Sequence, residues 1–304
     1  MKIGLGLAGF FTIPVKSAIR TISAIGYDGF EVYVWNDYIF DSSVLDPTHM
    51  SSSLLKRKTQ EIKNLAKEFD VSISAVLSLD IEFGYRNPCE DTRLEHIKFT
   101  KQSIDMAADM GVDIVNVTSG QPLKDLPMKA SWEKLVDTVG KYVDYASKRG
   151  VTVAMEPHAP FKGKDMMVDS VETCLRLLKT INHKNFKVNF DQSHFSIRGW
   201  DVPDTIRRLS KFIVHTHLKG SRGLYPKYQW YIPGEYPEDK DVIKEYALAL
   251  KEIGYKGFMS AEIANSRRTE MLFDPIYAAR LAYDTMSSVL EQLGLRKSKS
   301  MSLR

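Results

Sequence analysis

The feature that most constrains the fold is a regular alternation of short apolar runs with longer amphipathic stretches along the 304-residue chain. The short runs are rich in Val, Ile and Phe and have the length of strands, whereas the stretches between them have helical periodicity. The pattern repeats eight times. The predicted strands are residues 2–8, 29–35, 71–77, 113–118, 151–156, 186–191, 212–218 and 257–263.

Strands that alternate with helices form parallel sheets, and eight such units in a chain of this length predict an α/β fold, a closed (β/α)8 TIM barrel. An open doubly wound sheet is the alternative. Its usual mark is a GxGxxG turn after the first strand, but Gly4, Gly6 and Gly9 lie within or at the end of that strand. We therefore predict one barrel domain over residues 1–293 and a basic, flexible tail over residues 294–304.

The distribution of charge argues against a polyanionic partner. The net charge of +4 comes from 42 basic and 38 acidic residues, and four of the basic ones lie in the last nine residues: Arg296, Lys297, Lys299 and Arg304. The remaining body is neutral and lacks the positive field by which proteins bind nucleic acid. No run approaches the roughly 18 apolar residues of a membrane span, and the N-terminus lacks the pattern of a signal peptide. We therefore expect a cytoplasmic protein with no nucleic-acid or membrane partner.

Four chemically reactive side chains are predicted to meet at one end of the barrel. Side chains alternate between the two faces of a strand, so every second residue of a barrel strand points into the lumen. In each of the last four strands, one series of alternate residues is mainly apolar and is assigned to the side that faces the helices. The other series points into the lumen, and its last residues are, in strand order, Glu156, Asp191, His217 and Glu262. These ends lie at the C-terminal mouth, where such barrels build their sites.

A cation is the simplest way to accommodate this group. Three carboxylates that converge in a lumen of low dielectric repel one another, unless their pKa values rise or a cation neutralises them. Three oxygens and one imidazole suit a divalent ion such as Mn²⁺, Mg²⁺ or Co²⁺, and no thiolate is near to favour structural zinc. Any one of these residues alone would more often be a paired rim group, but four in the same register favour a ligand set.

The same residues lie in motifs that resemble a known family. EPH (156–158), DQSH (191–194), HLKG (217–220) and GYKGFMSAE (254–262) resemble the xylose-isomerase-like barrel superfamily, the sugar phosphate isomerase/epimerase group, over essentially the whole chain. In its ketose 3-epimerases, Glu, Asp, His and Glu hold one divalent ion. The resemblance therefore implies Glu156, Asp191, His217 and Glu262 as ligands, with Mn²⁺ favoured over Co²⁺ or Mg²⁺. The HLKD of the family is HLKG here, so Gly220 replaces an acidic residue.

The resemblance implies an isomerase or epimerase of a ketose or related sugar, which removes a proton next to a carbonyl and stabilises the enediolate on the metal. In the family the first and last metal-bound glutamates transfer the protons, so Glu156 and Glu262 are the predicted catalytic residues. Rim packing or exposure to solvent is the alternative role for each predicted substrate-binding residue: His158, His194, Lys219, Arg222, Trp35 and Trp230.

Three other functions compete with this one. A lyase or deglycosidase acting on 3-keto sugars or glycosides needs the same metal and the same proton abstraction, and the sequence does not separate it. An endonuclease-IV-type phosphodiesterase binds three zinc ions with additional histidines, some of them at the ends of the third and fourth strands. It is disfavoured because these strands end here in LSLD (77–80) and VTSG (117–120), without histidine. A sugar-binding barrel without catalysis is disfavoured because all four ligand positions are filled. We expect a small-molecule sugar as the partner, and a homo-oligomer because family members are often dimers or tetramers.

Overall fold

The computed structural model describes residues 1–10, 13–35, 44–45, 50–79, 90–123, 126–160, 165–263 and 274–297. All eight predicted strands form. They are β1 (Lys2–Gly6), β2 (Gly29–Trp35), β4 (Ser72–Leu79), β5 (Ile114–Thr118), β6 (Thr152–Glu156), β7 (Phe186–Asp191), β8 (Ile213–Leu218) and β11 (Phe258–Ala261).

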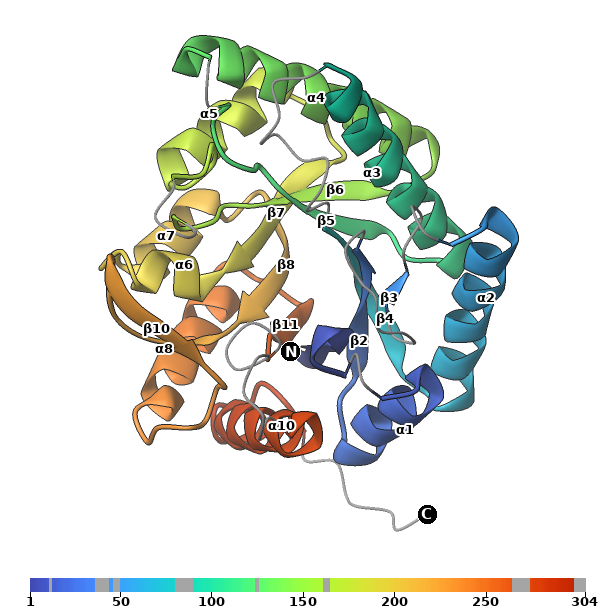
Figure 1. Ribbon diagram of the computed structural model, residues 1–304. Helices are drawn as coiled ribbons and strands as arrows, with labels where there is room; N and C mark the ends of the chain where they lie inside the picture. Colours follow the sequence, from blue (N-terminus) through green and yellow to red (C-terminus); the bar gives the residue numbers. More distant parts are fainter. Residues whose placement is uncertain are drawn as a thin grey trace.

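These strands form a closed ring, seen end-on in Figure 1. Their order is β1-β11-β8-β7-β6-β5-β4-β2, and β1 also pairs with β2, so the sheet has no open edge. Every pairing in the ring is parallel. A two-residue strand, β3 (Val44–Leu45), adds to the end of β2. The prediction of a single closed (β/α)8 barrel is confirmed.

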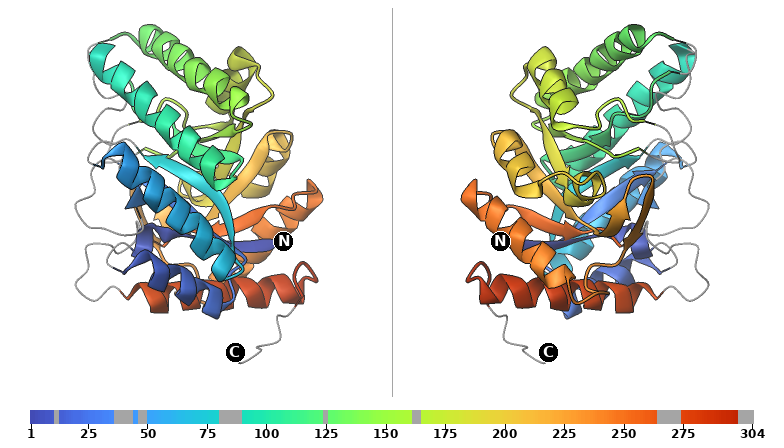
Figure 2. Two further views of the ribbon diagram at one scale, coloured as in Figure 1. Left: turned by 90° about the vertical axis from the view of Figure 1, so that its right-hand side faces the viewer. Right: turned by 90° about the vertical axis from the view of Figure 1, so that its left-hand side faces the viewer.

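Helices surround the ring, and α10 lies beside α1, so the last helix completes the outer layer next to the first (Figures 1 and 2). The helices are η1 (Leu7–Phe10), α1 (Val15–Ile25), α2 (Ser52–Glu68), α3 (Glu90–Met110), α4 (Met128–Lys148), α5 (Val171–Ile181), α6 (Gln192–Ser196), α7 (Val202–Leu209), α8 (Asp239–Glu252) and α10 (Pro275–Gln292).

Helix α5 illustrates how the sequence sets these boundaries. At its start, Ser170 and Thr173 form a capping box that satisfies backbone donors of the first turn. At its end, Asn182 takes the left-handed conformation (φ 45°), which few residues other than Gly and Asn adopt readily. Between the caps, Cys174 and Leu177 are fully buried against the barrel. The remaining face is available to solvent.

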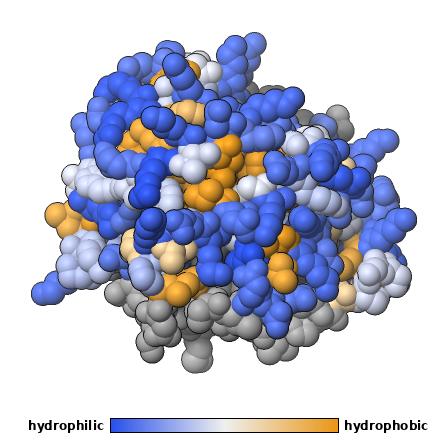
Figure 3. Space-filling view, turned by 90° about the horizontal axis from the view of Figure 1, so that it is seen from above, coloured by the Kyte–Doolittle hydropathy of each residue, from blue (hydrophilic) through white to orange (hydrophobic). Residues whose placement is uncertain are grey.

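The outer surface is consistent with amphipathic helices. Seen from above, over the side of the molecule that carries α3, α4 and α5, the surface is mostly hydrophilic, with apolar residues exposed in small groups (Figure 3). None of the helices in the described ranges is long and apolar enough to cross a membrane.

The lumen has a polar interior in the second half of the barrel. Helix-facing Met155 and Phe190 are fully buried and belong to the hydrophobic core. On the other parity, the Asn189 amide lies 3.3 Å from His217 Nδ1, and Ser260 Oγ lies 3.3 Å from His215 Nε2. The alternation predicted for these strands is therefore confirmed, and it directs polar side chains into the barrel.

The chain beyond α10 is attached to the barrel. The Met1 ammonium donates to the carbonyl oxygen of Leu295 at 2.7 Å, and the Arg296 guanidinium pairs with Asp28. Asp28 also accepts a hydrogen bond from the backbone N–H of Ile3 at 2.8 Å, so this carboxylate connects the chain end to β1. These contacts involve Leu295 and Arg296, and the flexible tail over residues 294–304 stays a prediction. Residues 298–304 lie outside the described ranges.

We predict that Gly29→Ala destabilises the protein, because the first residue of β2 has no room for a Cβ. An added Cβ would stand 2.6 Å from the Ser72 carbonyl oxygen and 2.7 Å from the Phe258 ring. Forcing this contact should lower the free energy of unfolding by about 1–3 kcal/mol in urea titrations. Gly140→Ala in α4 is the control: its Cβ would lie 4.0 Å from Ile181, and the change should add about 0.5–1 kcal/mol. Equal effects of the two substitutions would contradict the close approach.

Candidate metal centre

The four side chains predicted to converge do meet at the C-terminal mouth. Ligand atoms of Glu156, Asp191, His217 and Glu262 all lie within 4.8 Å of one another. Nδ1 of His217 lies 3.3 Å from Glu156 Oε1 and 3.7 Å from Glu262 Oε2. None of the four residues is more than 5% exposed. The parallel register explains the convergence, because Asp191 and Ser260 are the direct neighbours of His217 on β7 and β11.

Local backbone structure orients the Asp191 carboxylate. Asp191 is the N-cap of the short helix α6, and its Oδ1 accepts a hydrogen bond from the backbone N–H of Ser193 at 2.8 Å. The other oxygen, Oδ2, is buried and has no hydrogen-bond partner among the described residues. It faces the Lys219 ammonium at 3.2 Å. One oxygen is therefore fixed by the backbone, and the other is directed at the cluster.

Lys219 supplies positive charge at the same place. Its ammonium lies 2.9 Å from Glu262 Oε2 and 4.8 Å from the centre of the Trp230 ring, and the residue is only 1% exposed. Its carbonyl accepts a hydrogen bond from the Gln192 amide. Burial alone would lower the pKa of Lys219, but Asp191 and Glu262 outweigh burial and raise it above its ordinary value. The lysine is therefore charged at neutral pH.

The charge balance fits a divalent cation. Burial would raise the pKa of Asp191, but Lys219 and His194 outweigh it and lower the pKa to about 2. The pKa of Glu156 is likewise held well below its ordinary value by His217 and His194. The raised pKa of His217 leaves its ring cationic until an ion displaces the proton, and three carboxylates and one ammonium then leave two negative charges, which one divalent ion neutralises. Because oxygen and imidazole donors suit such ions, the cluster could hold a metal.

Three further predicted residues form a wall beside the cluster. The rings of His158 and His194 lie 3.7 Å apart, and Trp230 stands edge-on to both, at 6.1 and 5.5 Å. Nε2 of His194 lies 3.6 Å from Glu156 Oε1. Burial, with the neighbouring His194, lowers the pKa of His158 to about 3, so this imidazole is neutral at physiological pH. The wall thus combines polar ring nitrogens with an aromatic face.

A β-hairpin brings Trp230 to the mouth. The long loop predicted after the seventh barrel strand contains β9 (Gly220–Leu224) and β10 (Lys227–Tyr231), paired antiparallel. The Tyr228 hydroxyl ties the hairpin to the carbonyl oxygen of Pro160 at 3.3 Å. Gly220, which replaces an acidic residue of the family motif, packs so closely on the Tyr231 ring that a Cβ would collide with it. The glycine is therefore a requirement of the hairpin.

The structure does not bring Arg222 to the cluster. Trp230 pairs with Ser221 across the hairpin, so Arg222, one residue further on, projects from the opposite face. It is exposed, and its guanidinium lies 4.6 Å from the centre of the Tyr236 ring. The predicted substrate contact of Arg222 is thus not supported by its position. Trp35 ends β2, is buried, and remains a prediction.

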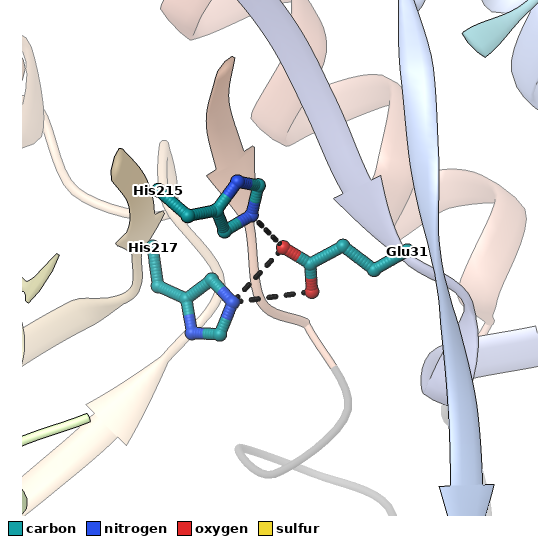
Figure 4. A group of neighbouring side chains, drawn as sticks. All are labelled: Glu31, His215 and His217. Carbon is teal, nitrogen blue, oxygen red and sulfur yellow. Dashed lines mark hydrogen bonds and ion pairs between the residues drawn. The ribbon is translucent and has the colours of Figure 1, made fainter. Parts of the chain in front are cut away.

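Glu31 is a residue that the sequence analysis did not identify. It projects from β2, is fully buried, and accepts hydrogen bonds from Nε2 of both His215 and His217 (Figure 4). The His217 contact spans 2.9 Å. Strict alternation in residues 29–35 puts Glu31, Tyr33 and Trp35 on one face, so the rule applied to the last four strands would also have found it.

The arrangement defines a class of protein, a closed barrel whose mouth carries a buried cluster suited to a divalent ion. The chain belongs to the family of xylose isomerase-like TIM barrels, whose model matches residues 19–288. The resemblance stated from the motifs is therefore confirmed. Fructoselysine 3-epimerase from Shigella flexneri is 22% identical over 294 residues, which are 96% of this chain and 99% of that protein.

Solved structures show the same fold. The apo form of 3-keto-D-glucoside 4-epimerase from E. coli is 19% identical, with a TM-score of 0.73 over 96% of this chain and 99% of that one. The IOLI protein with a bound zinc atom is also 19% identical, with a TM-score of 0.71 over 96% and 99%. At these identities the likeness establishes the architecture.

We predict that Lys219→Met strongly destabilises the metal-free protein. Removing the ammonium leaves Asp191 and Glu262 buried without their positive partner, which should cost about 3–5 kcal/mol of unfolding free energy. The control is Lys141→Met, which removes a surface pair with Asp137 and should cost less than about 1 kcal/mol. Chemical denaturation in EDTA measures both. A Lys219→Met variant as stable as the control would show that the ammonium does not neutralise the cluster.

We predict that divalent ions bind more tightly as the pH rises. Despite burial, Glu31 and Glu156 raise the pKa of His217 well above its ordinary value, so at lower pH the ring is protonated on both nitrogens. An ion that takes Nδ1 must displace that proton, so affinity should rise about tenfold per pH unit below this pKa. Calorimetry with Mn²⁺ in buffers of different ionisation enthalpy reports the released proton. Affinity independent of pH between about 6 and 8 would contradict the prediction.

Proposed function

We propose that this protein is a divalent-metal-dependent epimerase or isomerase of a ketose or related sugar. The observation that carries the proposal is the cluster of Glu156, Asp191, His217 and Glu262, whose ligand atoms lie within 4.8 Å of one another at the barrel mouth. The relatives support it, because proteins matched over nearly the whole chain are named as sugar epimerases. Mn²⁺ is the proposed ion, with Co²⁺ or Mg²⁺ as alternatives.

The proposed reaction moves a proton at a carbon next to a carbonyl. A divalent ion held by Glu156, Asp191, His217 and Glu262 would polarise the carbonyl and acidify the neighbouring C–H bond. Glu156 and Glu262 arrive from strands that β7 and β8 separate in the ring, so they approach a sugar from different sides. One carboxylate accepts the proton and the other returns one to the opposite face, which inverts the carbon.

Lys219 and His194 orient the carboxylates of Glu262 and Glu156, respectively. The Lys219 ammonium lies 2.9 Å from Glu262 Oε2 and keeps that oxygen at the mouth. Although burial would raise the pKa of Glu156, His217 and His194, whose Nε2 lies 3.6 Å from Glu156 Oε1, lower it and favour the ionised form of Glu156. A carboxylate that starts ionised can act as the proton acceptor.

The wall beside the cluster is the proposed sugar subsite. His158 and His194 offer ring nitrogens to sugar hydroxyls, and the Trp230 ring, edge-on to both, offers an apolar surface to the sugar's C–H face. Trp35 is proposed to contribute a second apolar contact. The partner is thus a small-molecule sugar, and a cytoplasmic location and self-association remain predictions.

A lyase or deglycosidase acting on 3-keto sugars or glycosides is the second candidate, since one structural relative is named for a 3-keto-D-glucoside. It would use the same proton abstraction and then expel a leaving group. Proton NMR of the products from a panel of ketoses, fructoselysine and 3-keto-glucosides separates the two. Inverted sugars support the epimerase, whereas a released aglycone or an unsaturated product supports the lyase.

We predict that activity requires both the metal and the two glutamates. EDTA should abolish turnover and Mn²⁺ should restore it, because the carbonyl must be polarised. Glu156→Gln and Glu262→Gln should each lower turnover by about 10²–10⁴-fold and reduce deuterium incorporation from D₂O at the inverted carbon. Metal content is measured alongside, because these residues are also the proposed ligands.

The control for these variants is Glu172→Gln, which removes an exposed carboxylate that pairs with Arg208 on the outer helices. It should leave turnover, metal content and isotope exchange unchanged. Full activity in EDTA, with no divalent ion found by elemental analysis, would refute the proposed function.

A further inference from the structure

Behind the metal-ligand cluster lies a second buried group, which the proposed reaction does not use. Glu31 projects from β2 toward two histidines of β8 (Figure 4). Its Oε1 accepts hydrogen bonds from His215 Nε2 and, at 2.9 Å, from His217 Nε2, and its Oε2 lies 3.1 Å from His217 Nε2. Each of the three residues is at most 1% exposed. Burying an ionised carboxylate costs free energy unless it is hydrogen-bonded, and here the two histidines supply the hydrogen bonds.

His217 stands between this group and the cluster. Its Nε2 faces Glu31, whereas its Nδ1 faces Glu156 at 3.3 Å and Glu262 at 3.7 Å. A carboxylate only accepts hydrogen bonds, so the nitrogen toward Glu31 carries the hydrogen. A neutral imidazole has one N–H and one lone pair, so the lone pair is then on Nδ1.

His215, with Ser260 beside it, fixes the orientation of the Glu31 carboxylate. His215 lies two residues before His217 on β8 and donates to the same oxygen of Glu31. Ser260 Oγ of β11 lies 3.3 Å from His215 Nε2. The two histidines of β8 therefore hold the Glu31 carboxylate, and Ser260 of β11 supports His215. These contacts define the position of Glu31 relative to His217.

We propose that Glu31 is a positioning residue of the metal centre: it holds His217 in the Nε2–H tautomer, with the Nδ1 lone pair directed at the ion. This inference rests on the proposed function, because it presupposes an ion bound by the cluster. Carboxylates that orient ligand histidines in this way typically strengthen metal binding about 10–100-fold. We expect Glu31 to strengthen metal binding by about the same factor.

A second ion among Glu31, His215 and His217 is the competing explanation, because their donor atoms are also close enough to share a metal. Direct hydrogen bonds from both imidazoles to Glu31 argue against it, since an ion in that place would take the lone pairs of nitrogens that are already donating. The positioning role requires one ion per chain, and the competing explanation requires two.

The test is the metal affinity of Glu31→Gln, which keeps the shape of the side chain but removes its charge. We expect Mn²⁺ to bind about 10–100-fold more weakly by calorimetry, with one ion per chain in the wild-type protein. Glu31→Asp, which keeps the carboxylate, should recover part of the loss. The control is Ser103→Ala on the outer helix α3, which loses a buried hydrogen bond to the Phe99 carbonyl oxygen and should leave affinity within about twofold.

A spectroscopic readout separates positioning from general destabilisation. In protein labelled with ¹⁵N-histidine and loaded with Zn²⁺, long-range ¹H–¹⁵N spectra should show His217 protonated on Nε2 and metal-bound through Nδ1. In Glu31→Gln the His217 signal should weaken, shift or report a mixture of tautomers. Three results would each overturn the inference: a wild-type His217 bound through Nε2, two ions per chain, or a Glu31→Gln affinity equal to that of Ser103→Ala. A wild-type protein that binds no divalent ion would instead refute the proposed function.

Discussion

The mutual repulsion of three buried carboxylates is the constraint on which the site depends. Glu156, Asp191 and Glu262 converge at the barrel mouth almost without exposure to water, where like charges interact strongly. The protein offsets part of this repulsion with the Lys219 ammonium and the His217 imidazole. The remaining negative charge suits a divalent ion, so the same repulsion that limits stability would favour binding of the proposed metal.

Stability and chemistry are divided between the two faces of the barrel strands. The outward faces carry apolar residues such as Val153 and Phe190, which pack under the helices as one hydrophobic core. The inward faces carry polar groups in two layers. The deeper layer contains Glu31 and His215, and the layer at the mouth contains the metal-ligand cluster. His217 belongs to both, which is why an interaction inside the lumen can influence binding at its opening.

The loops at the mouth determine what else a substrate meets. The β9–β10 hairpin folds over the wall formed by His158 and His194 and contributes Trp230 from one of its faces. The alternation that directs Trp230 inward also directs Arg222 outward, so the hairpin presents an aromatic ring, and not this guanidinium, to the site. The Lys219 ammonium at the cluster is already paired with Asp191 and Glu262.

The sequence by itself determined the barrel and the four converging side chains, because both follow from periodicities along single strands. Eight repeats specify closure, and alternation within residues 151–156, 186–191, 212–218 and 257–263 places Glu156, Asp191, His217 and Glu262 at the same end. Only the tertiary structure decided which partners these side chains have. Glu31 reaches His217 across 186 positions of the chain, because closure brings β2 and β8 to face each other through the lumen. Lys219 and Arg222 are three residues apart, yet one points into the cluster and the other to solvent, since a hairpin begins between them. Such contacts depend on register and chain reversal, which local patterns do not encode.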